Sequence, residues 1–215
     1  MDYKNKPEGY YKNVRTEMLG YLPSNAKKIL DVGCGNGAFA FIIKEKNNAE
    51  VWGIEYVKEQ GTEAKSKLDK VFVGMCEDFI DELPDKYFDV IYFNDVLEHL
   101  AYPDDVLKRI KTKLSSKGVI ISSIPNMRFY GTFRKLIFGK DWKYDDHGVM
   151  DKTHLRYFTS KSIRRMFKES GYSINKHEGI NKSRSLKPYL FYVLTLFTQL
   201  DMRYVQYATV ASVKK

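Results

Sequence analysis

The feature that most constrains this fold is an apolar strand that runs directly into a glycine-dense turn. Residues 29–37 read Ile-Leu-Asp-Val-Gly-Cys-Gly-Asn-Gly, and a helical pattern follows them. Glycine lets a backbone approach a ligand closely, because no Cβ stands in the way. A strand, a glycine turn and a helix in this order are typical of nucleotide sites in α/β sheets. The alternative is a plain turn from strand to helix, without a ligand.

Apolar runs alternate with amphipathic stretches along the chain, which is the pattern of β-α units around a mostly parallel sheet. The predicted strands are residues 28–32, 50–55, 70–73, 88–93, 118–123, 172–177 and 204–212. The predicted helices are residues 10–21, 38–46, 58–68, 78–83, 96–99, 103–114 and 160–170. The last two strands need no crossover helix between them, so they are free to pair antiparallel.

Two segments depart from this rhythm. The 215 residues suit one domain with a buried core. We predict a single domain over residues 1–215, in which inserts at about 126–159 and 181–201 cover the acceptor site. The second insert reads as a helix whose apolar residues almost encircle it. That pattern favours burial, as a cover or an oligomer contact, over a one-sided membrane-surface helix.

Cysteine content and hydropathy indicate the surroundings of the protein. Cys34 and Cys76 are too few for a disulfide framework, and the first residues lack the apolar core of a signal peptide. The longest apolar run, at 189–200, has 12 residues and is too short to cross a bilayer. We therefore expect a cytoplasmic globular protein without a transmembrane segment, and a homodimer stays open.

Charge is unevenly distributed along the chain. Residues 1–107 hold 13 Lys and Arg against 20 Asp and Glu, whereas residues 108–215 hold 23 against 7. An acidic half favours a cationic ligand and a basic half favours an anionic one. The sequence therefore predicts two partners of opposite charge, although a solvated basic surface explains many of the lysines equally well.

Carboxylates gather after the predicted strands, at the edge where open α/β sheets bind ligands. They are Asp31, Glu55, Glu77, Asp78, Asp95 and Glu98. A carboxylate at the mouth of a pyrophosphate site repels its ligand, but it attracts an ammonium or sulfonium cation. S-adenosylmethionine joins such a cation to a ribose and an adenine, and it is the predicted cofactor. Gly33, Gly35 and Ala38 also satisfy the looser dinucleotide fingerprint, so an NAD-dependent oxidoreductase stays open.

On the loop DVGCGNG at 31–37 and the stretch FDVIYFNDVLEHL at 88–100, the chain resembles the class I S-adenosylmethionine-dependent methyltransferases. This resemblance covers nearly the whole chain. It implies a Rossmann-like, seven-stranded, mostly parallel sheet with an antiparallel last strand and helices on both faces. It also implies cofactor contacts: Asp31, Gly33 and Gly35 at the methionine end, with Cys34 and Gly37 in the same loop, Glu55 at the ribose, Cys76 and Glu77 at the adenine, and Asn94 under the methionine.

A polar loop before the predicted helix at 160–170 holds candidates for catalysis. Asp151, Thr153, His154 and Arg156 fall within six positions, and a hydroxyl acceptor needs a base to remove its proton. We predict His154 as this base, with Asp151 beside it. The alternative is an insert held in place by its own Asp, His and Arg contacts.

His99 is a competing base. The run Asp95-Val-Leu-Glu98-His99 resembles the E-x-x-E-H stretch of ubiquinone-pathway O-methyltransferases, in which such residues can hold a divalent cation. Asp95 replaces the first Glu of that stretch. The three side chains share one face if the segment is helical. An acidic pair at a helix start is also a common cap, and we predict no metal.

The basic second half is where we expect the acceptor. Ser-Ile-Pro-Asn at 123–126, followed by G-x-x-D-x-T-H-x-R-x-F-T at 148–159, resembles a bacterial methyltransferase subgroup linked to polysaccharide and glycan pathways. The resemblance implies a hydroxyl on a small-molecule or glycan acceptor, and the positive charge predicts that this acceptor is anionic. Arg128, Arg134 and Arg156 are the predicted anion contacts. An RNA-modifying enzyme and a module that only senses the cofactor stay open, but no RNA-binding motif is present and we expect no nucleic acid.

Overall fold

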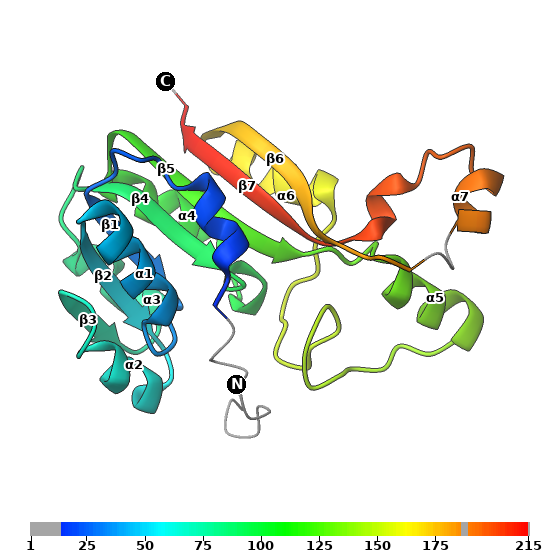
Figure 1. The fold of residues 1–215 in the computed structure, drawn as a ribbon, viewed down its shortest axis with the longest axis horizontal. Coiled ribbons are helices and arrows are strands. Elements are labelled where there is room, and N and C mark those ends of the chain that lie inside the picture. Colours follow the sequence, from blue (N-terminus) through cyan, green and yellow to red (C-terminus); the bar gives the residue numbers. More distant parts are fainter. Residues whose placement is uncertain (1–13, 186–188, 215) are drawn as a thin grey trace.

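The computed structural model describes residues 14–185 and 189–214. Their seven strands form one sheet in the order β3-β2-β1-β4-β5-β7-β6 (Figure 1). Strands β1 to β5 pair with one another in parallel, whereas β7 runs antiparallel to both β5 and β6. The strands are β1 (Lys28–Val32), β2 (Glu50–Glu55), β3 (Lys70–Val73), β4 (Phe88–Asn94), β5 (Leu114–Pro125), β6 (Tyr172–Lys182) and β7 (Tyr204–Val213). The predicted fold class is confirmed.

Helices cover both faces of this sheet because successive strand residues point to opposite sides. Ile29 and Leu30 are neighbours in β1, yet they belong to different core clusters. One cluster includes residues of η2 (Thr16–Tyr21), α1 (Ala38–Asn47) and α2 (Lys58–Ala64). The other includes residues of α3 (Cys76–Phe79), η3 (Ile80–Glu82), α4 (Pro103–Ile110) and α6 (Ser160–Glu169). The remaining short elements are η4 (Leu97–His99), η5 (Lys111–Lys113), α5 (Tyr130–Gly139), α7 (Tyr189–Leu194) and η6 (Leu200–Arg203).

Helix α4 illustrates how the sequence specifies these layers. Pro103 lies in its first turn, where a missing backbone N–H costs nothing. Val106, Leu107 and Ile110 form a buried stripe, because positions three and four apart share one helix face. The opposite face and the ends carry charged residues, so the helix packs on the sheet in one orientation only.

Most predicted elements are found, with differences at their ends. Strands β1, β2 and β3 match their predicted ranges, whereas β6 continues to Lys182 because its pairing with β7 continues. The predicted helix at 58–68 ends at Ala64 and the one at 96–99 is a 3-10 turn. Of the helix predicted at 10–21, only Thr16–Tyr21 is helical, as a 3-10 turn, and residues 10–13 lie outside the described residues.

The two inserts differ most from the sequence-based expectation. The first contains a ten-residue helix, α5, that the sequence analysis did not predict. In the second, the predicted helix over 181–201 is wrong, because α7 spans only Tyr189–Leu194. The backbone turns at Leu196 and Phe197, both with positive φ, before η6 begins. Leu196 is 83% exposed, so the apolar residues of this segment are not uniformly buried.

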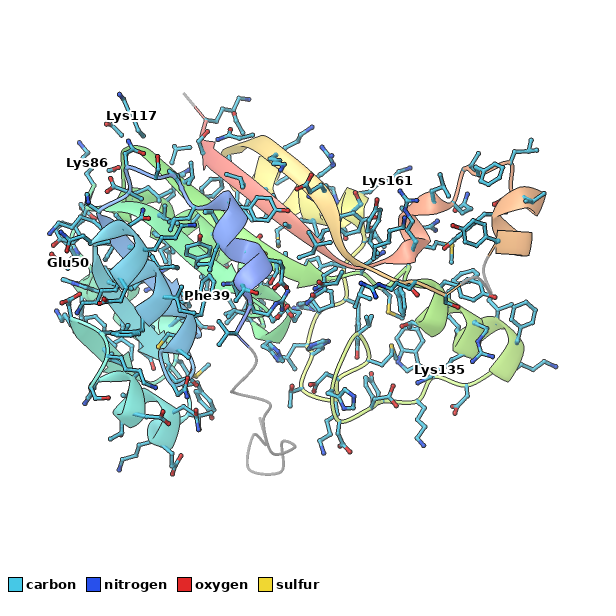
Figure 2. All side chains as sticks on the ribbon, viewed as in Figure 1. Phe39, Glu50, Lys86, Lys117, Lys135 and Lys161 are labelled. Atoms are coloured by element: carbon cyan, nitrogen blue, oxygen red, sulfur yellow. The ribbon has the colours of Figure 1, made fainter. Side chains whose placement is uncertain are left out.

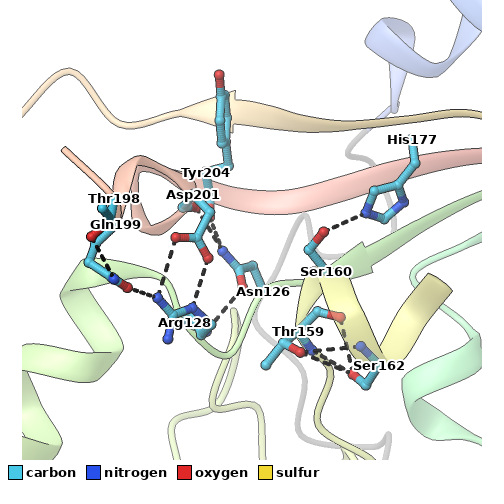
Figure 3. Close-up of polar contacts among 10 residues, drawn as sticks. All are labelled: Asn126, Arg128, Thr159, Ser160, Ser162, His177, Thr198, Gln199, Asp201 and Tyr204. Atoms are coloured by element: carbon cyan, nitrogen blue, oxygen red, sulfur yellow. Dashed lines mark hydrogen bonds and ion pairs between the residues drawn. The ribbon is translucent and has the colours of Figure 1, made fainter. Parts of the chain in front are cut away.

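The inserts lie together at one end of the molecule, away from α2 and β3 (Figure 1). A polar network, drawn in Figure 3, fixes them to the sheet. The buried Asn126 amide donates to the carbonyls of Asp201 and Tyr204, and Arg128 Nε donates to Asp201 Oδ2 at 2.8 Å. The end of β5 and the turn η6 are therefore held against each other. Within the described residues, no helix has the length and hydropathy that crossing a membrane requires.

Candidate active site

A large cavity opens at the carboxyl ends of β1, β2 and β4, and we call it the first cavity. Its volume is about 1180 Å³. The strand ends and the glycine turn form one side, and Phe39 of α1, labelled in Figure 2, belongs to this wall. The opposite side comes from distant parts of the chain: residues 14, 15 and 17, the loop at 147–155, Asn181 of β6, and Val205 and Gln206 of β7.

The glycine turn needs glycine for two different reasons. Gly33 has a φ of 74°, and a Cβ there would lie 2.4 Å from Cγ2 of Val96, so packing excludes a side chain. Gly35 has a φ of 54°, and an added Cβ would meet no atom within 4 Å. Because Gly35 lines the cavity, a side chain at this position would occupy space that a ligand needs.

Glu55 connects the end of β2 to the glycine turn. Its Oε2 accepts a hydrogen bond from the Gly35 amide, and its Oε1 accepts one from the Val57 amide, both at 2.8 Å. The side chain is buried, and burial raises the pKa of its carboxyl. A carboxylate has about four lone-pair sites, so each oxygen keeps an acceptor position for a ligand hydroxyl. Its geometry suits the predicted contact with a ribose.

Asp31 and Asn94 present polar atoms to the cavity without a partner. Among the described residues, Oδ1 of Asp31 and both amide atoms of Asn94 are buried and make no hydrogen bond. Desolvation and the nearby charge of Glu55 raise the pKa of Asp31 to about 8. Buried polar groups without partners cost free energy. A ligand that brings positive charge and hydrogen-bonding groups would satisfy both residues, which fits the amino-acid end of S-adenosylmethionine.

Eight of the nine residues predicted to contact the cofactor line the first cavity. They are Asp31, Gly33, Cys34, Gly35, Glu55, Cys76, Glu77 and Asn94. The ninth, Gly37, is instead the N-cap of α1, with a φ of 79°. Both cysteines are free thiols, and Sγ of Cys76 lies 3.2 Å from Oε2 of Glu77. The assignment of these side chains to parts of the cofactor stays a prediction.

On the far side of the cavity, the structure brings the two competing histidines together. The rings of His99 and His154 are 4.7 Å apart between centroids and meet edge to face. Glu98 lies beside them, with Oε1 4.0 Å from Nε2 of His154. All three side chains are buried. Sequence analysis weighed His99 and His154 as alternatives, but they form one cluster.

Hydrogen bonds orient both imidazole rings in the same way. Nδ1 of His99 lies 3.1 Å from the Thr153 carbonyl, and Nδ1 of His154 lies 3.1 Å from the Val149 carbonyl. A carbonyl only accepts, so Nδ1 carries the proton in each neutral ring and Nε2 carries the lone pair. A lone pair fixed in this way suits either a general base or a metal ligand.

The cluster also corrects the geometry expected for a cation. Ligand atoms of Glu98, His99 and His154 lie within 4.8 Å of one another, close enough to surround one ion. Asp95, which the sequence grouped with Glu98 and His99, is not a member. The segment is not α-helical, since Asp95 has a φ of 55° and only a 3-10 turn follows it. The Asp95 carboxylate instead pairs with Arg15 and accepts a hydrogen bond from Gln206.

Asp151 and Arg156 hold the loop that carries His154. Oδ1 of Asp151 accepts from the Thr153 amide at 2.8 Å and from its hydroxyl at 2.7 Å. Arg156 donates through Nε and Nη2 to the Ala101 carbonyl. The backbone amide of Arg156 donates to the Glu98 carbonyl, as does that of the residue before it. These contacts fasten the loop to η4, so Asp151 lines the cavity but its carboxylate orients the backbone.

None of the three predicted anion contacts lines the first cavity. Arg128 pairs with Asp201, and Arg156 is bound to Ala101. Arg134 lines a different cavity, between the inserts. Their predicted role in binding the acceptor therefore stays a prediction, and it does not apply to the wall of the first cavity.

Sequence reasoning missed the contribution of Arg15 and Gln206. Both line the first cavity, and Nη2 of Arg15 donates to Oε1 of Gln206 at 2.8 Å. They join the start of the described chain to β7 across the mouth of the cavity. Neither residue belongs to a local motif, and the only signal for Arg15 is a charge within the helix predicted at 10–21.

Comparisons with known proteins agree with this arrangement. Residues 3–177 match the protein family described as "Methyltransferase domain". A ubiquinone biosynthesis O-methyltransferase from Aeromonas salmonicida is 28% identical over 163 residues, which cover 72% of this chain and 66% of that protein. The mitochondrial ubiquinone biosynthesis O-methyltransferase of Saccharomyces cerevisiae is 28% identical over 177 residues, which cover 76% of this chain and 56% of that protein. The chain thus spans about half to two thirds of the length of these relatives.

Solved structures share the fold across nearly the whole chain. A SAM dependent methyltransferase from Archaeoglobus fulgidus superimposes with a TM-score of 0.71 at 18% identity, covering 98% of this chain and 99% of that one. An S-adenosylmethionine dependent methyltransferase from Mesorhizobium loti gives a TM-score of 0.63 at 18% identity, covering 91% and 95%. At these identities the likeness shows the fold alone, whereas the family match shows descent. The chain therefore belongs to the methyltransferase domain family, within the class I enzymes that use S-adenosylmethionine.

Proposed function

We propose that the chain transfers a methyl group to a hydroxyl of a small-molecule or glycan acceptor, with His154 as the base. The observation that carries the proposal is the buried cluster of Glu98, His99 and His154, which lines the same cavity as the glycine turn. The relatives named as O-methyltransferases support a hydroxyl acceptor. The motif at 148–159, which resembles enzymes of glycan pathways, supports the sugar alternative.

Positioning supplies much of the rate in such a displacement. S-adenosylmethionine, when bound, supplies a methyl carbon on a sulfonium sulfur, which keeps the electron pair of the broken bond as the acceptor oxygen attacks. Asp31 would hold the amino-acid end of that cofactor, and Glu55 would hold its ribose. Nε2 of His154 takes the proton that the hydroxyl loses, and its Nδ1–H bond to the Val149 carbonyl keeps the ring oriented.

Glu98 stabilises the charge that this step leaves on His154. Its carboxylate is 1% exposed and makes no hydrogen bond among the described residues. Burial raises the pKa of this carboxyl to about 8, and an imidazolium 4.0 Å away would favour its ionised form and be stabilised by it. The loop at 147–155 forms one wall of the same cavity, which supports the proposal that the first insert covers the acceptor.

Two histidine variants and a matched control test this proposal. We expect His154→Ala to lower turnover by about 100-fold or more, within the range for general bases, while binding of S-adenosylhomocysteine is retained. His177→Asn is the control, since His177 does not line the cavity: it bonds Ser160 at the start of α6 (Figure 3) and Thr209 of β7. Turnover is measured with radiolabelled methyl donor on a panel of phenols and nucleotide sugars.

The alternatives give different results in the same assay. If His154→Ala keeps its turnover and His99→Ala loses it, His99 is the base. If a chelator abolishes wild-type turnover and a divalent cation restores it, the three side chains serve a metal ion instead. Loss of S-adenosylhomocysteine binding in His154→Ala would contradict the assignment of this residue to the acceptor side.

A further inference from the structure

A second cavity lies between the two inserts, with a volume of about 420 Å³. This volume is within the range of small-molecule sites, which is roughly 300 to 1,000 Å³. It is bounded by α5, by the start of α7 and by η6, and none of these elements belongs to the glycine-turn edge of the sheet. We call it the second cavity.

The lining of the second cavity combines cations with aromatic rings. The described residues that line it include no Asp or Glu. The cations are Arg134, Lys182 and Arg203, and the aromatic residues are Phe129, Tyr130, Tyr189, Tyr192 and Phe197. Guanidinium and ammonium groups bind phosphate oxygens, and aromatic rings accept an apolar or planar body. The chemistry of this lining fits an anionic group attached to an apolar or aromatic one.

Arg203 has an unsatisfied donor at this cavity. Its Nη2 donates to the Tyr204 hydroxyl at 2.8 Å, and its guanidinium lies 4.9 Å from the centre of the Tyr204 ring. Its Nε is buried and makes no hydrogen bond among the described residues. A buried cationic donor without an acceptor is costly, so an anion at this position would stabilise the arrangement.

Three chain segments connect the second cavity to the first. On β6, Asn181 lines the first cavity and the next residue, Lys182, lines the second. Where η6 meets β7, Val205 of β7 lines the first cavity, while Arg203 of η6 lines the second. Pro125, the last residue of β5, lines the first cavity, and Phe129, four positions later, lines the second. The two cavities are therefore neighbours at the end of one group of strands.

The network around Arg128 holds the second cavity in place. Arg128 and Asn126 tie the end of β5 to Asp201, which precedes Arg203 in η6 (Figure 3). Because Asp201 neutralises Arg128, the charge that faces the second cavity comes from Arg134, Lys182 and Arg203. A ligand that spans both cavities would meet walls with a fixed separation.

We propose that the second cavity binds the phosphate or diphosphate of an organic ester, and that this ester is the far end of the methyl acceptor. The apolar or planar body lies against the aromatic wall, the phosphates contact the three cations, and the reacting hydroxyl reaches the histidine cluster. This inference rests on the proposed function. A nucleoside diphosphate and a prenyl diphosphate share the required chemistry.

Calorimetric titration of the full chain, saturated with S-adenosylhomocysteine, tests the inference with UDP and farnesyl diphosphate as probes. We expect at least one probe to bind, and the double variant R134Q/K182Q to weaken that binding at least tenfold. Both substituted side chains are exposed, so folding is not at risk. The control is K117Q/K161Q, which removes two exposed lysines outside both cavities (Figure 2) and is expected to change affinity less than twofold.

Each result has a defined meaning. Tighter binding of UDP identifies a nucleotide ester and tighter binding of farnesyl diphosphate identifies a lipid ester, and both support the inference. Absence of binding by both probes overturns it, as does equal weakening in the two double variants, which would indicate diffuse attraction to a basic surface. Failure of S-adenosylhomocysteine to bind would overturn the proposed function instead, and that titration is made first.

Discussion

Glu55 is the side chain on which we expect cofactor binding to depend most directly. Its carboxylate accepts the amides of Gly35 and Val57 and faces the cavity. We expect Glu55→Ala to weaken S-adenosylhomocysteine binding about 100-fold, because the carboxylate would no longer accept two charge-assisted hydrogen bonds from the ribose hydroxyls. Calorimetry checks this, with Glu59→Ala on the exposed side of α2 as the control. Equal affinity in the two variants would place the cofactor elsewhere.

We expect Asp31 to make cofactor binding depend on pH. Its pKa of about 8 means that the carboxyl is largely protonated near neutral pH when no ligand is bound. A cationic ligand favours the ionised form and lowers this pKa, so binding releases a proton. Affinity for S-adenosylmethionine is therefore expected to rise from about pH 6 to about pH 8 and then to level off. Calorimetry across this range should show a flatter profile for Asp31→Asn, and a flat wild-type profile would contradict the assignment.

Local motifs made it possible to predict which residues near the glycine turn line the first cavity. Arg15 and Gln206 also line it, but they belong to no such motif and were missed. The glycine turn and Glu55 lie at the ends of adjacent strands, so sequence order and sheet order give their positions together. The roles of Arg128 and Arg156 depend on partners elsewhere in the chain, Asp201 and the Ala101 carbonyl. Both were predicted as anion contacts from their charge alone, since a sequence does not show which cations already have a partner in the folded chain.

At the scale of elements, the start of α6 is a test of local stability. Thr159 is its N-cap: its side chain accepts from the Ser162 amide, and the Ser162 hydroxyl accepts from the Thr159 amide at 2.8 Å. Thr159→Ala is expected to lower the free energy of unfolding by about 1 kcal/mol, whereas Thr159→Asp retains most of it. Urea denaturation measures both variants, with the exposed Ser116→Ala as the control. Equal midpoints for all three would mean that the cap contributes nothing.

Elements whose ends are marked by clear start and stop signals in the sequence were predicted well, and the inserts were not. Each of the first three strands is short, apolar and bounded by polar or glycine residues, so its period and ends are visible in the sequence. The helix α5 has apolar residues at helical spacing, Tyr130, Phe133 and Ile137, but it buries only Thr132, so its pattern does not mark a helix that faces the core. In the second insert, the apolar run suggests one continuous helix, but the backbone turns within that run, at Leu196 and Phe197.

At the scale of the whole molecule, ligand-induced stabilisation distinguishes the two cofactors that the glycine turn allows. S-adenosylhomocysteine at about 100 times its Kd is expected to stabilise the fold by about 2.7 kcal/mol, which raises Tm by roughly 5 to 10 °C in a chain of this size. NAD at the same concentration is expected to leave Tm unchanged. Thermal denaturation followed by circular dichroism measures both, and a shift with NAD alone would contradict the family assignment.

The charge asymmetry of the sequence reappears in the two cavities. Among the described residues, the acidic side chains of the first cavity outnumber its one arginine, Arg15: they are Glu17, Asp31, Glu55, Glu77, Asp95, Glu98 and Asp151. The second cavity has three cations and no acid among the described residues. The sequence predicted two partners of opposite charge, and the two linings differ in charge in that sense, but none of the three predicted arginine contacts lines the first cavity.

The position of β7 between β5 and β6 has a consequence for biosynthesis. Both β5 and β6 are synthesised before residues 204–213, yet these two strands have no direct pairing with each other. During translation, β5 therefore presents an open edge, and β6 has no neighbour until the last strand emerges and enters the gap. The sheet therefore cannot be complete before residues 204–213 have been made, and a nascent chain stalled before residue 204 would be a natural target for chaperones.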